Sequence, residues 1–148
     1  MRISAKGRYA LASTIHMAQN HNSNEYITLI SISEKLGISK IYLEQVFSLL
    51  KHGGIVSSIK GAQGGYQLTQ LPSQITVYDI LHSVETTLFE RAEETVAESL
   101  PEIERAMSAA VHQPLDHSIK STLQSITLLD LVTEAEKHKS DQSYMFFI

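Results

Sequence analysis

The sequence predicts a mainly α-helical chain with one small β-hairpin, arranged as a winged helix-turn-helix head followed by C-terminal dimerisation helices. Two amphipathic helices are joined through a turn at Gly37, and a glycine-rich hairpin directly follows the second helix. The helices predicted in the rest of the chain have more apolar surface on their faces than a small head can cover. We expect the head at residues 1–75, a helical dimerisation region at 76–140 and a C-terminal tail at 141–148.

Composition narrows the functional classes. The chain has 148 residues and no cysteine, which excludes disulfides, thiolate nucleophiles and cysteine-ligated zinc or iron–sulfur sites. No apolar stretch approaches the roughly 18 residues that a membrane span needs, so we expect a cytoplasmic protein without a membrane partner. Residues 1–70 contain seven Lys and Arg against three acids, a net charge of +4, whereas the remainder has a net charge of −8. The basic part can face phosphates while the acidic part faces away.

The first two helices are predicted from apolar spacing. Residues 4–21 form the first, with an apolar stripe at Leu11, Ala12, Ile15 and Ala18. Ser31 and Glu34 fit a capping box that begins the second. Its buried side is expected to hold Leu29, Ile32 and Leu36, and Gly37 gives the chain a tight exit.

The third helix is the clearest amphipathic element. Ser39 can cap it, and it is expected to reach about His52. Its apolar positions follow the i, i+3, i+4, i+7 pattern and are Leu43, Val46, Phe47 and Leu50. The opposite face is mixed and polar, as in the recognition helix of a helix-turn-helix, and presents Lys40, Ile41, Glu44, Gln45 and Ser48.

A hairpin is predicted next. The strand-like runs 55–60 and 66–69 flank the glycine-rich tip 61–65. Lys60 and the glycines would let the backbone approach a phosphate or a narrow minor groove closely, which is the role of a wing. The alternative is a plain hairpin exposed to solvent.

The remaining chain reads as helices. Thr76 and Asp79 resemble a capping box ahead of an apolar stripe at Val77, Ile80, Leu81 and Val84. Residues 86–99 are expected to be a loose helix or loop. A further helix, with apolar positions Leu100, Ile103, Met107 and Val111, should end or kink at Pro114 because proline cannot donate a helical hydrogen bond.

An apolar seam continues past Pro114, and we expect it to be buried against a second copy of the chain. Packing within one chain is the alternative. The seam residues are Leu115, Ile119, Leu123 and Ile126. Thr127 and Asp130 then begin a last helix whose inner face holds Leu128, Leu131, Val132 and Ala135.

Four segments in order resemble one family. They are residues 1–10 (MRISAKGRYA), 38–45 (ISKIYLEQ), 60–66 (KGAQGGY) and 127–131 (TLLDL). Together they span nearly the whole chain and resemble the winged-helix transcriptional regulators of the IscR, NsrR and CymR family. The resemblance implies a homodimer on double-stranded DNA, with recognition helices in successive major grooves and wings at the flanking minor grooves.

The resemblance also implies which residues contact DNA. Glu44 could accept a hydrogen bond from a cytosine amino group, and Gln45 could pair with adenine. Lys60 stands where many members have arginine. It keeps the positive charge but lacks the planar guanidinium group and its paired N–H donors. The implied DNA-contacting set is Arg2, Ser4, Lys6, Arg8, Tyr9, Ser39, Lys40, Tyr42, Glu44, Gln45, Ser48, Lys60, Gly61, Gln63, Gly64, Gly65 and Tyr66.

Two features place the chain within the family. Members that hold an iron–sulfur cluster have three cysteines between wing and dimer helix, whereas residues 88–112 here have none, so no cofactor is expected. His112 and His117 lack companions for a metal site. The ending, Tyr144, Met145, Phe146, Phe147 and Ile148, resembles the cysteine-metabolism repressor subgroup. The resemblance to that subgroup implies that the tail docks on cysteine synthase (O-acetylserine thiol-lyase). The alternative is that the tail folds back on its own dimer.

The leading hypothesis is therefore a DNA-binding repressor of cysteine or sulfur genes that senses through a partner protein. A same-family regulator answering another signal and a winged-helix interaction module without a DNA role are the alternatives. The sequence contains no Cys–His pair, nucleophile elbow, P-loop or ordered carboxylate pair, so we do not expect an enzyme.

Overall fold

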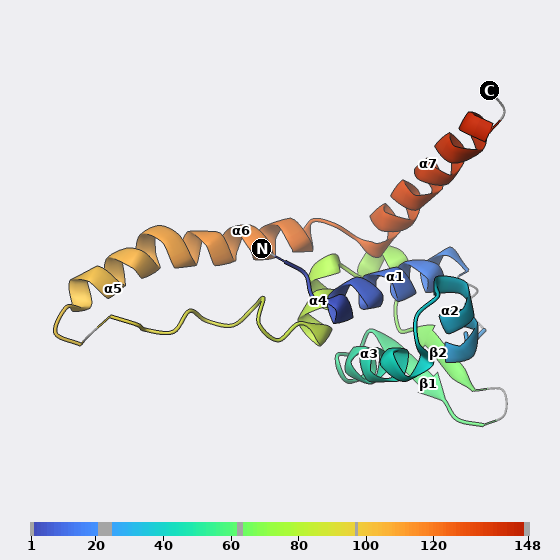
Figure 1. Ribbon diagram of the computed structural model, residues 1–148, viewed down its shortest axis with the longest axis horizontal. Coiled ribbons are helices and arrows are strands. Elements are labelled where there is room, and N and C mark those ends of the chain that lie inside the picture. Colours follow the sequence, from blue (N-terminus) through green and yellow to red (C-terminus); the bar gives the residue numbers. More distant parts are fainter. Residues whose placement is uncertain (1, 21–24, 62–63, 97, 147–148) are drawn as a thin grey trace.

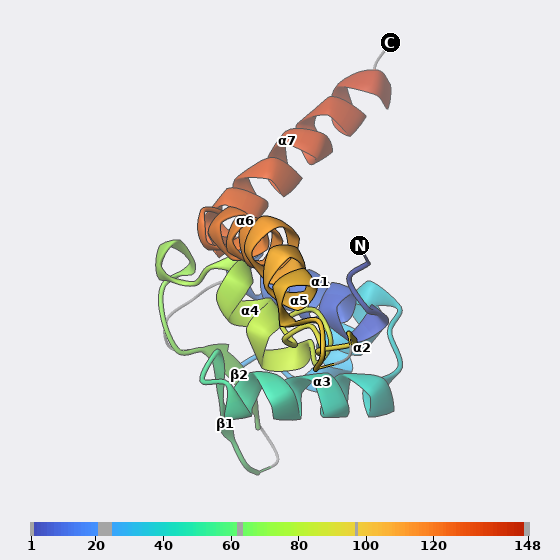
Figure 2. The ribbon, with the colours of Figure 1, turned by 90° about the vertical axis from the view of Figure 1, so that its left-hand side faces the viewer.

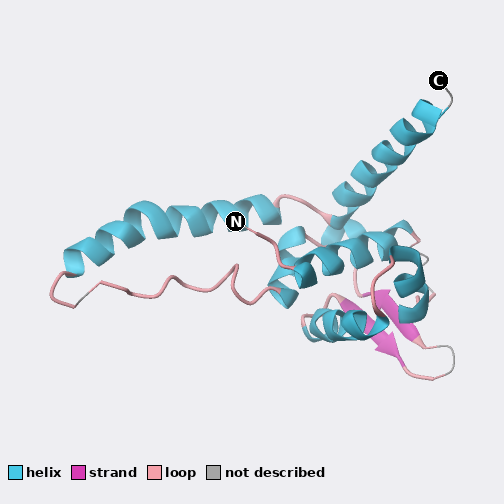
Figure 3. Cartoon of the chain, viewed as in Figure 1, coloured by secondary structure: helices cyan, strands magenta, loops and turns pink. Residues whose placement is uncertain are grey.

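The computed structural model has a helical head with a two-stranded hairpin and two helical extensions (Figures 1 and 3). It describes residues 2–20, 25–61, 64–96 and 98–146, and side chains as far as residue 142. In chain order the elements are α1 (Ala5–Gln19), α2 (Leu29–Leu36), α3 (Lys40–His52), β1 (Val56–Ile59), β2 (Gly65–Leu68), the 3₁₀ turn η1 (Pro72–Gln74), α4 (Val77–Val84), α5 (Pro101–Met107), the π-helical turn η2 (Ser108–His112), α6 (Gln113–Gln124) and α7 (Leu128–Phe146). The mainly helical fold with a small hairpin is confirmed.

The head is organised around α3. Its four predicted apolar residues have no exposed surface: Leu43, Val46, Phe47 and Leu50. They pack in one cluster with residues of α1, α2, the hairpin and α4. Burial of one such side chain stabilises the fold by about 1.5–3 kcal/mol, so this face fixes α3 firmly in the head.

The buried face of α1 differs from the prediction. The fully buried residues are Gly7, Ala10, Ser13, Thr14, Met17 and Ala18, whereas Leu11, Ala12 and Ile15 are only half-buried. The helix contacts α2, α3, α4 and α7, so it is covered on more than one side. Small residues permit this close approach, and the hydroxyl of Thr14 donates to the carbonyl of Ala10 at 2.8 Å. Apolar periodicity alone does not identify such a face.

The start of α2 is also corrected. Its N-cap is Thr28, whose side-chain oxygen accepts from the amide of Ser31 at 3.2 Å. Ser31 lies inside the helix, where its hydroxyl donates to the carbonyl of Thr28 at 2.9 Å. The turn at Gly37 is as predicted, with a φ of +67° that glycine adopts readily. At the next helix, Ser39 occupies the N-cap position of α3 without a side-chain capping bond.

The predicted hairpin is present and is attached to the head. β1 and β2 are antiparallel, with Val56 opposite Leu68 and Ile59 opposite Gly65. Tyr66 exchanges both backbone hydrogen bonds with Ile27, each 2.8 Å long. The described part of the hairpin therefore has a fixed position next to α3, and residues 62–63 lie outside the described part.

The hydrophobic core crosses the boundary expected after residue 75. The Thr76–Asp79 capping box of α4 is confirmed, and the four apolar residues predicted for α4 are buried. Ile75 accepts a backbone hydrogen bond from Leu128 at 2.8 Å, and Leu128 has no exposed surface. The head thus includes α4 and the start of α7.

The capping box predicted for the last helix is confirmed too. The backbone amide of Thr127 donates to Asp130 at 2.8 Å, and the amide of Asp130 donates to the Thr127 hydroxyl oxygen at 3.1 Å. The backbone bond first, and then a side-chain bond from Thr127, lower the pKa of Asp130 below its ordinary value. The helix that follows runs away from the head (Figure 1).

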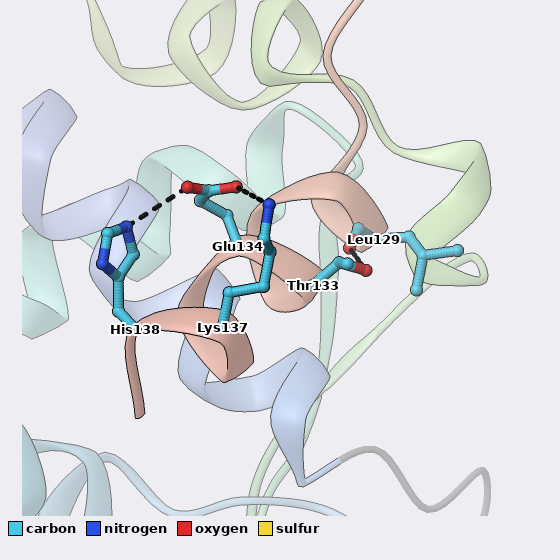
Figure 4. A network of polar contacts seen from close by, with 5 residues as sticks. All are labelled: Leu129, Thr133, Glu134, Lys137 and His138. Atoms are coloured by element: carbon cyan, nitrogen blue, oxygen red, sulfur yellow. Dashed lines mark hydrogen bonds and ion pairs between the residues drawn. The ribbon is translucent and has the colours of Figure 1, made fainter. Parts of the chain in front are cut away.

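The α7 helix has an outer face of exposed polar residues. Glu134 lies 3.9 Å from the Lys137 ammonium and 3.2 Å from the His138 imidazole, while Thr133 donates to the carbonyl of Leu129 (Figure 4). The helix continues to Phe146 and so includes most of the segment 141–148 that was expected to be a separate tail. None of the described helices is both long enough and apolar enough to span a membrane.

The second extension, which we call the arm, comprises α5, η2 and α6. The helix was predicted to end or kink at Pro114. It does not end there, but a π-helical turn precedes the proline, and the amide of Gln113 donates to the carbonyl of Ser108 five residues back. Widening the turn accommodates a residue that lacks a backbone donor. Residues 86–99, where described, are irregular and connect α4 to the arm.

Candidate nucleic-acid interface

One face of α3 is turned to solvent. Its residues, which we call the outer strip, are Lys40, Ile41, Glu44, Gln45 and Ser48, and all are exposed. The opposite face of the same helix is completely buried. The strip is therefore presented by a helix that cannot easily rotate or shift, which is the property required of a surface that reads DNA.

Charge on the outer strip is partly balanced internally. The ammonium of Lys40 lies 3.6 Å from the carboxylate of Glu44, one turn away, and both side chains are about half-exposed. Such a surface ion pair contributes little stability. It does reduce the repulsion that Glu44 would exert on phosphates, and it leaves Gln45 as an uncharged hydrogen-bonding group beside the pair.

The N-terminal turns of α1 lie beside the strip. Lys6 lines a shallow groove together with Ile41, Glu44, Gln45, Ser48 and Leu49. The rings of Tyr9 and Tyr42 meet edge to face with centroids 5.1 Å apart. Both tyrosines are half-buried against the core, so they hold α1 on α3 and place Lys6 at the strip.

Ser4, for which the resemblance implies a DNA contact, has a structural role within this chain, and the DNA contact stays a prediction. It is the N-cap of α1, and its hydroxyl oxygen accepts from the amide of Gly7 at 3.2 Å. Its own amide and hydroxyl donate to one oxygen of Glu85, at 2.9 and 2.8 Å. The chain's own carboxylate therefore occupies this helix N-terminus, where negative charge is favourable. Arg2 and Arg8 remain exposed nearby, and Arg8 donates to the carbonyl of Ile3 at 3.2 Å.

Glu85 is the residue that sequence reasoning missed. It is 8% exposed and lies 81 positions from Ser4 along the chain. A side chain at Gly7 would collide with this carboxylate and come within 2.6 Å of Ile3, so the glycine makes room for the contact. No local pattern indicates a contact between such distant residues.

The hairpin contributes an exposed lysine to the same region. Lys60 directly follows β1 and is exposed. Gly61 has a φ of +125°, which favours glycine. A side chain at Gly64 would come within 2.6 Å of the carbonyl of Ile59, and one at Gly65 within 2.6 Å of the carbonyl of Ile27. These glycines are therefore explained by the closure and attachment of the hairpin.

Tyr66 is likewise structural. Its ring packs on Phe47 with centroids 4.8 Å apart, and it lies half-buried at the edge of the core. The DNA contact that the resemblance implies for Tyr66 stays a prediction. Gln63, which was also predicted to contact DNA, lies outside the described residues.

The elements of the interface share one side of the molecule. In two perpendicular views, α3 and the hairpin lie below the core, whereas α6 and α7 lie above it (Figures 1 and 2). Lys40 is in α3 and Lys60 directly follows β1, so both belong to elements on this side, and Lys6 lines the groove on α3. A rod-shaped polyanion could contact this side without meeting α6 or α7.

The residues predicted for dimerisation lie mostly on the arm. Leu115 is 50% exposed, while Ile119 and Leu123 are half-buried. With Ile3 and Leu88 they line an apolar groove between α6 and the head. Ile126 is placed differently, in the connection after α6, where its carbonyl accepts from the amide of Val77 at 2.9 Å.

Comparison with known proteins identifies relatives over most of the chain. A sequence model of the Rrf2 family, described as "Iron-dependent Transcriptional regulator", matches residues 3–134. The chain is 36% identical to the HTH-type transcriptional regulator CymR of Bacillus subtilis over 148 residues, which is 100% of both chains. It is 35% identical to IscR of Photorhabdus laumondii over 136 residues, covering 92% of this chain and 82% of that protein.

Solved structures agree with these relatives. The structure of CymR, the global cysteine regulator of B. subtilis, has a TM-score of 0.71 and 34% identity, covering 90% of this chain and 98% of that chain. IscR of T. potens has a TM-score of 0.72 and 32% identity, covering 99% of this chain and 96% of that chain.

The iron in the family description does not fit the residues of this chain. Protein iron–sulfur clusters are held mainly by cysteine thiolates, and the sequence has no cysteine. Among the described residues, no three His, Asp or Glu side chains gather as metal ligands. His112 is half-buried and His117 exposed, both outside any such group.

The match over residues 3–134 and the relatives above 30% identity nevertheless decide the family. The chain belongs to the Rrf2 family of transcriptional regulators.

Proposed function

We propose that this regulator binds double-stranded DNA as a homodimer and represses genes of cysteine or sulfur metabolism. The observation that carries the proposal is the exposed polar outer strip on a helix whose other face is fully buried, next to Lys6 and Lys60. An α-helix fits the major groove of B-form DNA, where side chains of the first turns of the recognition helix reach the base edges. The protein acts in the cytoplasm and performs no catalysis of its own.

Base reading is assigned to the outer strip. Gln45 has both a donor and an acceptor and pairs with the N6 and N7 atoms of adenine. Glu44 accepts from a cytosine amino group, with Lys40 keeping its charge compensated at 3.6 Å. Lys60 contacts backbone phosphates or the adjacent minor groove and positions the head without selecting sequence.

The arm supplies the dimer contact. None of the described residues of α5 or α6 is buried within one chain, although the two helices carry apolar side chains. Leu115, Ile119 and Leu123 are spaced one turn apart and form one seam along α6. A second copy packed on this seam would remove it from water and would present two outer strips to a pseudo-palindromic site.

The link to cysteine genes is supported by full-length similarity to CymR, whose structure is named for the global cysteine regulator. The absence of cysteine from the sequence favours a signal other than a cluster in this chain. We place the signal in a partner, cysteine synthase, that docks on Tyr144, Met145, Phe146, Phe147 and Ile148. The mostly exposed, polar stretch of α7 at residues 133–142 and the direction of the helix away from the head leave room for such a partner.

The test begins with selection of bound sites from random duplexes, with and without cysteine synthase and O-acetylserine. On the selected duplex, Gln45→Ala is expected to weaken binding by about 1–3 kcal/mol and to relax one base position per half-site. Gln124→Ala, a matched change on the arm, should leave affinity unchanged. Equal losses for Gln45→Ala on selected and random duplexes would contradict base reading.

The phosphate contact is tested by salt dependence. Lys60→Ala should reduce the slope of log affinity against log salt concentration by about one unit. Lys139→Ala removes the same charge from exposed α7 and should leave the slope unchanged. An identical slope for Lys60→Ala and the unmodified protein would contradict phosphate contact.

Partner docking is tested by deletion. Removing Phe147 and Ile148 should abolish co-elution with cysteine synthase and leave DNA affinity intact. Lys139→Ala serves here as a surface control that should retain co-elution. Persistent co-elution after the deletion would overturn the docking proposal and leave a different signal as the alternative.

A further inference from the structure

The outer strip contains one side chain whose exposure the fold does not explain. Ile41, in the first turn of α3, is 72% exposed, the highest value among the large apolar side chains of the described residues. A single exposed apolar residue is ordinary on a protein surface. Its position is what distinguishes Ile41, since it lies in the shallow groove with Lys6, Gln45 and Ser48.

The head does not use Ile41 for packing. The inner face of α3 is complete without it, because Leu43, Val46, Phe47 and Leu50 are all fully buried. Within the described structure its apolar surface is thus free for an external contact. Isoleucine is also branched at Cβ, so its few rotamers in a helix present the methyl groups in a nearly fixed direction.

We propose that Ile41 reads thymine by contacting the C5 methyl group, an inference that rests on the proposed DNA-binding function. Among the four bases, thymine alone presents an apolar group at its major-groove edge. The first turn of a recognition helix is the part that lies nearest the base edges. The hydrogen-bonding residues Glu44 and Gln45 cannot recognise that methyl group, so Ile41 adds a discrimination that they lack.

The helix geometry limits where this thymine lies. Ile41 and Gln45 are four residues apart, which is about 6 Å along the axis of α3. Successive base pairs are about 3.4 Å apart. The thymine read by Ile41 is therefore expected in the base pair that Gln45 reads or within about two base pairs of it.

Replacing thymine with deoxyuridine in the selected duplex tests the contact, because only the C5 methyl group is removed. Deoxyuridine at one particular thymine position of a single half-site should weaken binding of the unmodified protein about fourfold, which is the loss expected for one buried methyl contact. Substitution in both half-sites should weaken binding by roughly fifteenfold. Other thymines should have little effect.

The Ile41→Ala variant should lose this sensitivity, with affinities for the thymine and deoxyuridine duplexes equal within about 1.5-fold. Alanine favours helix, so the variant should fold normally. Ile30→Ala truncates a second exposed isoleucine, on α2, and should keep the full fourfold effect.

The outcomes separate the inference from the function on which it rests. Specific binding that is insensitive to every deoxyuridine would overturn the role of Ile41 alone. The same conclusion would follow if Ile41→Ala kept the sensitivity of the unmodified protein. A protein that selects no duplex at all would overturn the proposed function and this inference together.

Discussion

The head and the arm are both built from amphipathic helices, yet they bury them differently. In the head, the apolar face of α3 has no exposed surface. In the arm, Ile103, Val111 and Leu115 are each between 43% and 54% exposed, and no described residue of α5 or α6 is buried. The head completes its core within one chain, whereas the arm has apolar surface that one chain leaves uncovered.

This difference separates two kinds of substitution. Changes in the head should alter the free energy of unfolding of a single chain. Changes on the arm seam should alter association between chains and leave the head intact. The variants below test this separation, from the largest expected effect to the smallest.

Phe47→Ala should have the largest effect. Phe47 is fully buried between α3 and the hairpin, where it also packs on Tyr66. Its truncation should lower the free energy of unfolding by about 3–5 kcal/mol. Urea denaturation at several protein concentrations would measure this, and a loss that depended on concentration would indicate that the head does not complete its own core.

Leu115→Asp should act on association. The side chain is half-exposed in one chain, so the charge is tolerated there, but a dimer contact would bury it. We expect the dimer to weaken by about 2 kcal/mol or more, seen as monomer in sedimentation. Ser121→Asp, on α6 but off the seam, is the control. Unchanged association of Leu115→Asp would exclude this seam from the dimer.

Glu85→Ala should have a smaller effect in the head. It would leave the amide and hydroxyl of Ser4 without their acceptor, at a cost of about 1–3 kcal/mol. Glu85→Gln keeps one acceptor oxygen and should retain more of the stability. Thermal unfolding would compare the two variants. Equal stability of Glu85→Ala and the unmodified protein would contradict a stabilising role for the hydrogen bonds between Ser4 and Glu85.

Thr127→Ala removes the cap of α7 and should cost about 1 kcal/mol. Thr133→Ala, whose hydroxyl donates within the helix, should cost less. The capping contact should also depend on pH. Because the pKa of Asp130 is lowered in the folded chain, its contribution is present above the ordinary value of 3.8 and is lost as the pH falls through the lowered pKa. A stability difference that stayed constant down to low pH would contradict this.

The elements that the sequence predicted well depend on local patterns. The stripe of α3, the turn at Gly37 and the capping boxes at Thr76 and Thr127 each follow from residues a few positions apart. Helix period and capping chemistry act over that range. The outer strip was predicted for the same reason, as the complement of the buried stripe.

Contacts between distant segments could not be predicted in this way. The bond from Ser4 to Glu85 spans 81 residues, and Tyr66 is held by Phe47 and Ile27. Both tertiary contacts give a structural role to a residue for which the resemblance implies a DNA contact. The face of α1 was missed because several elements cover it, so burial there follows size more than hydrophobicity.

The central claim is that the outer strip of α3 lies in the major groove. Because the sequence has no cysteine, Ser48→Cys carries a unique thiol to which a DNA-cleaving iron chelate can be attached. On the selected duplex, the account predicts two symmetric clusters of cleavage about one helical turn or a multiple of it apart, and none from the same chelate on Lys139→Cys in α7. Bound protein whose Ser48→Cys conjugate cut no more than the Lys139→Cys conjugate would contradict the account.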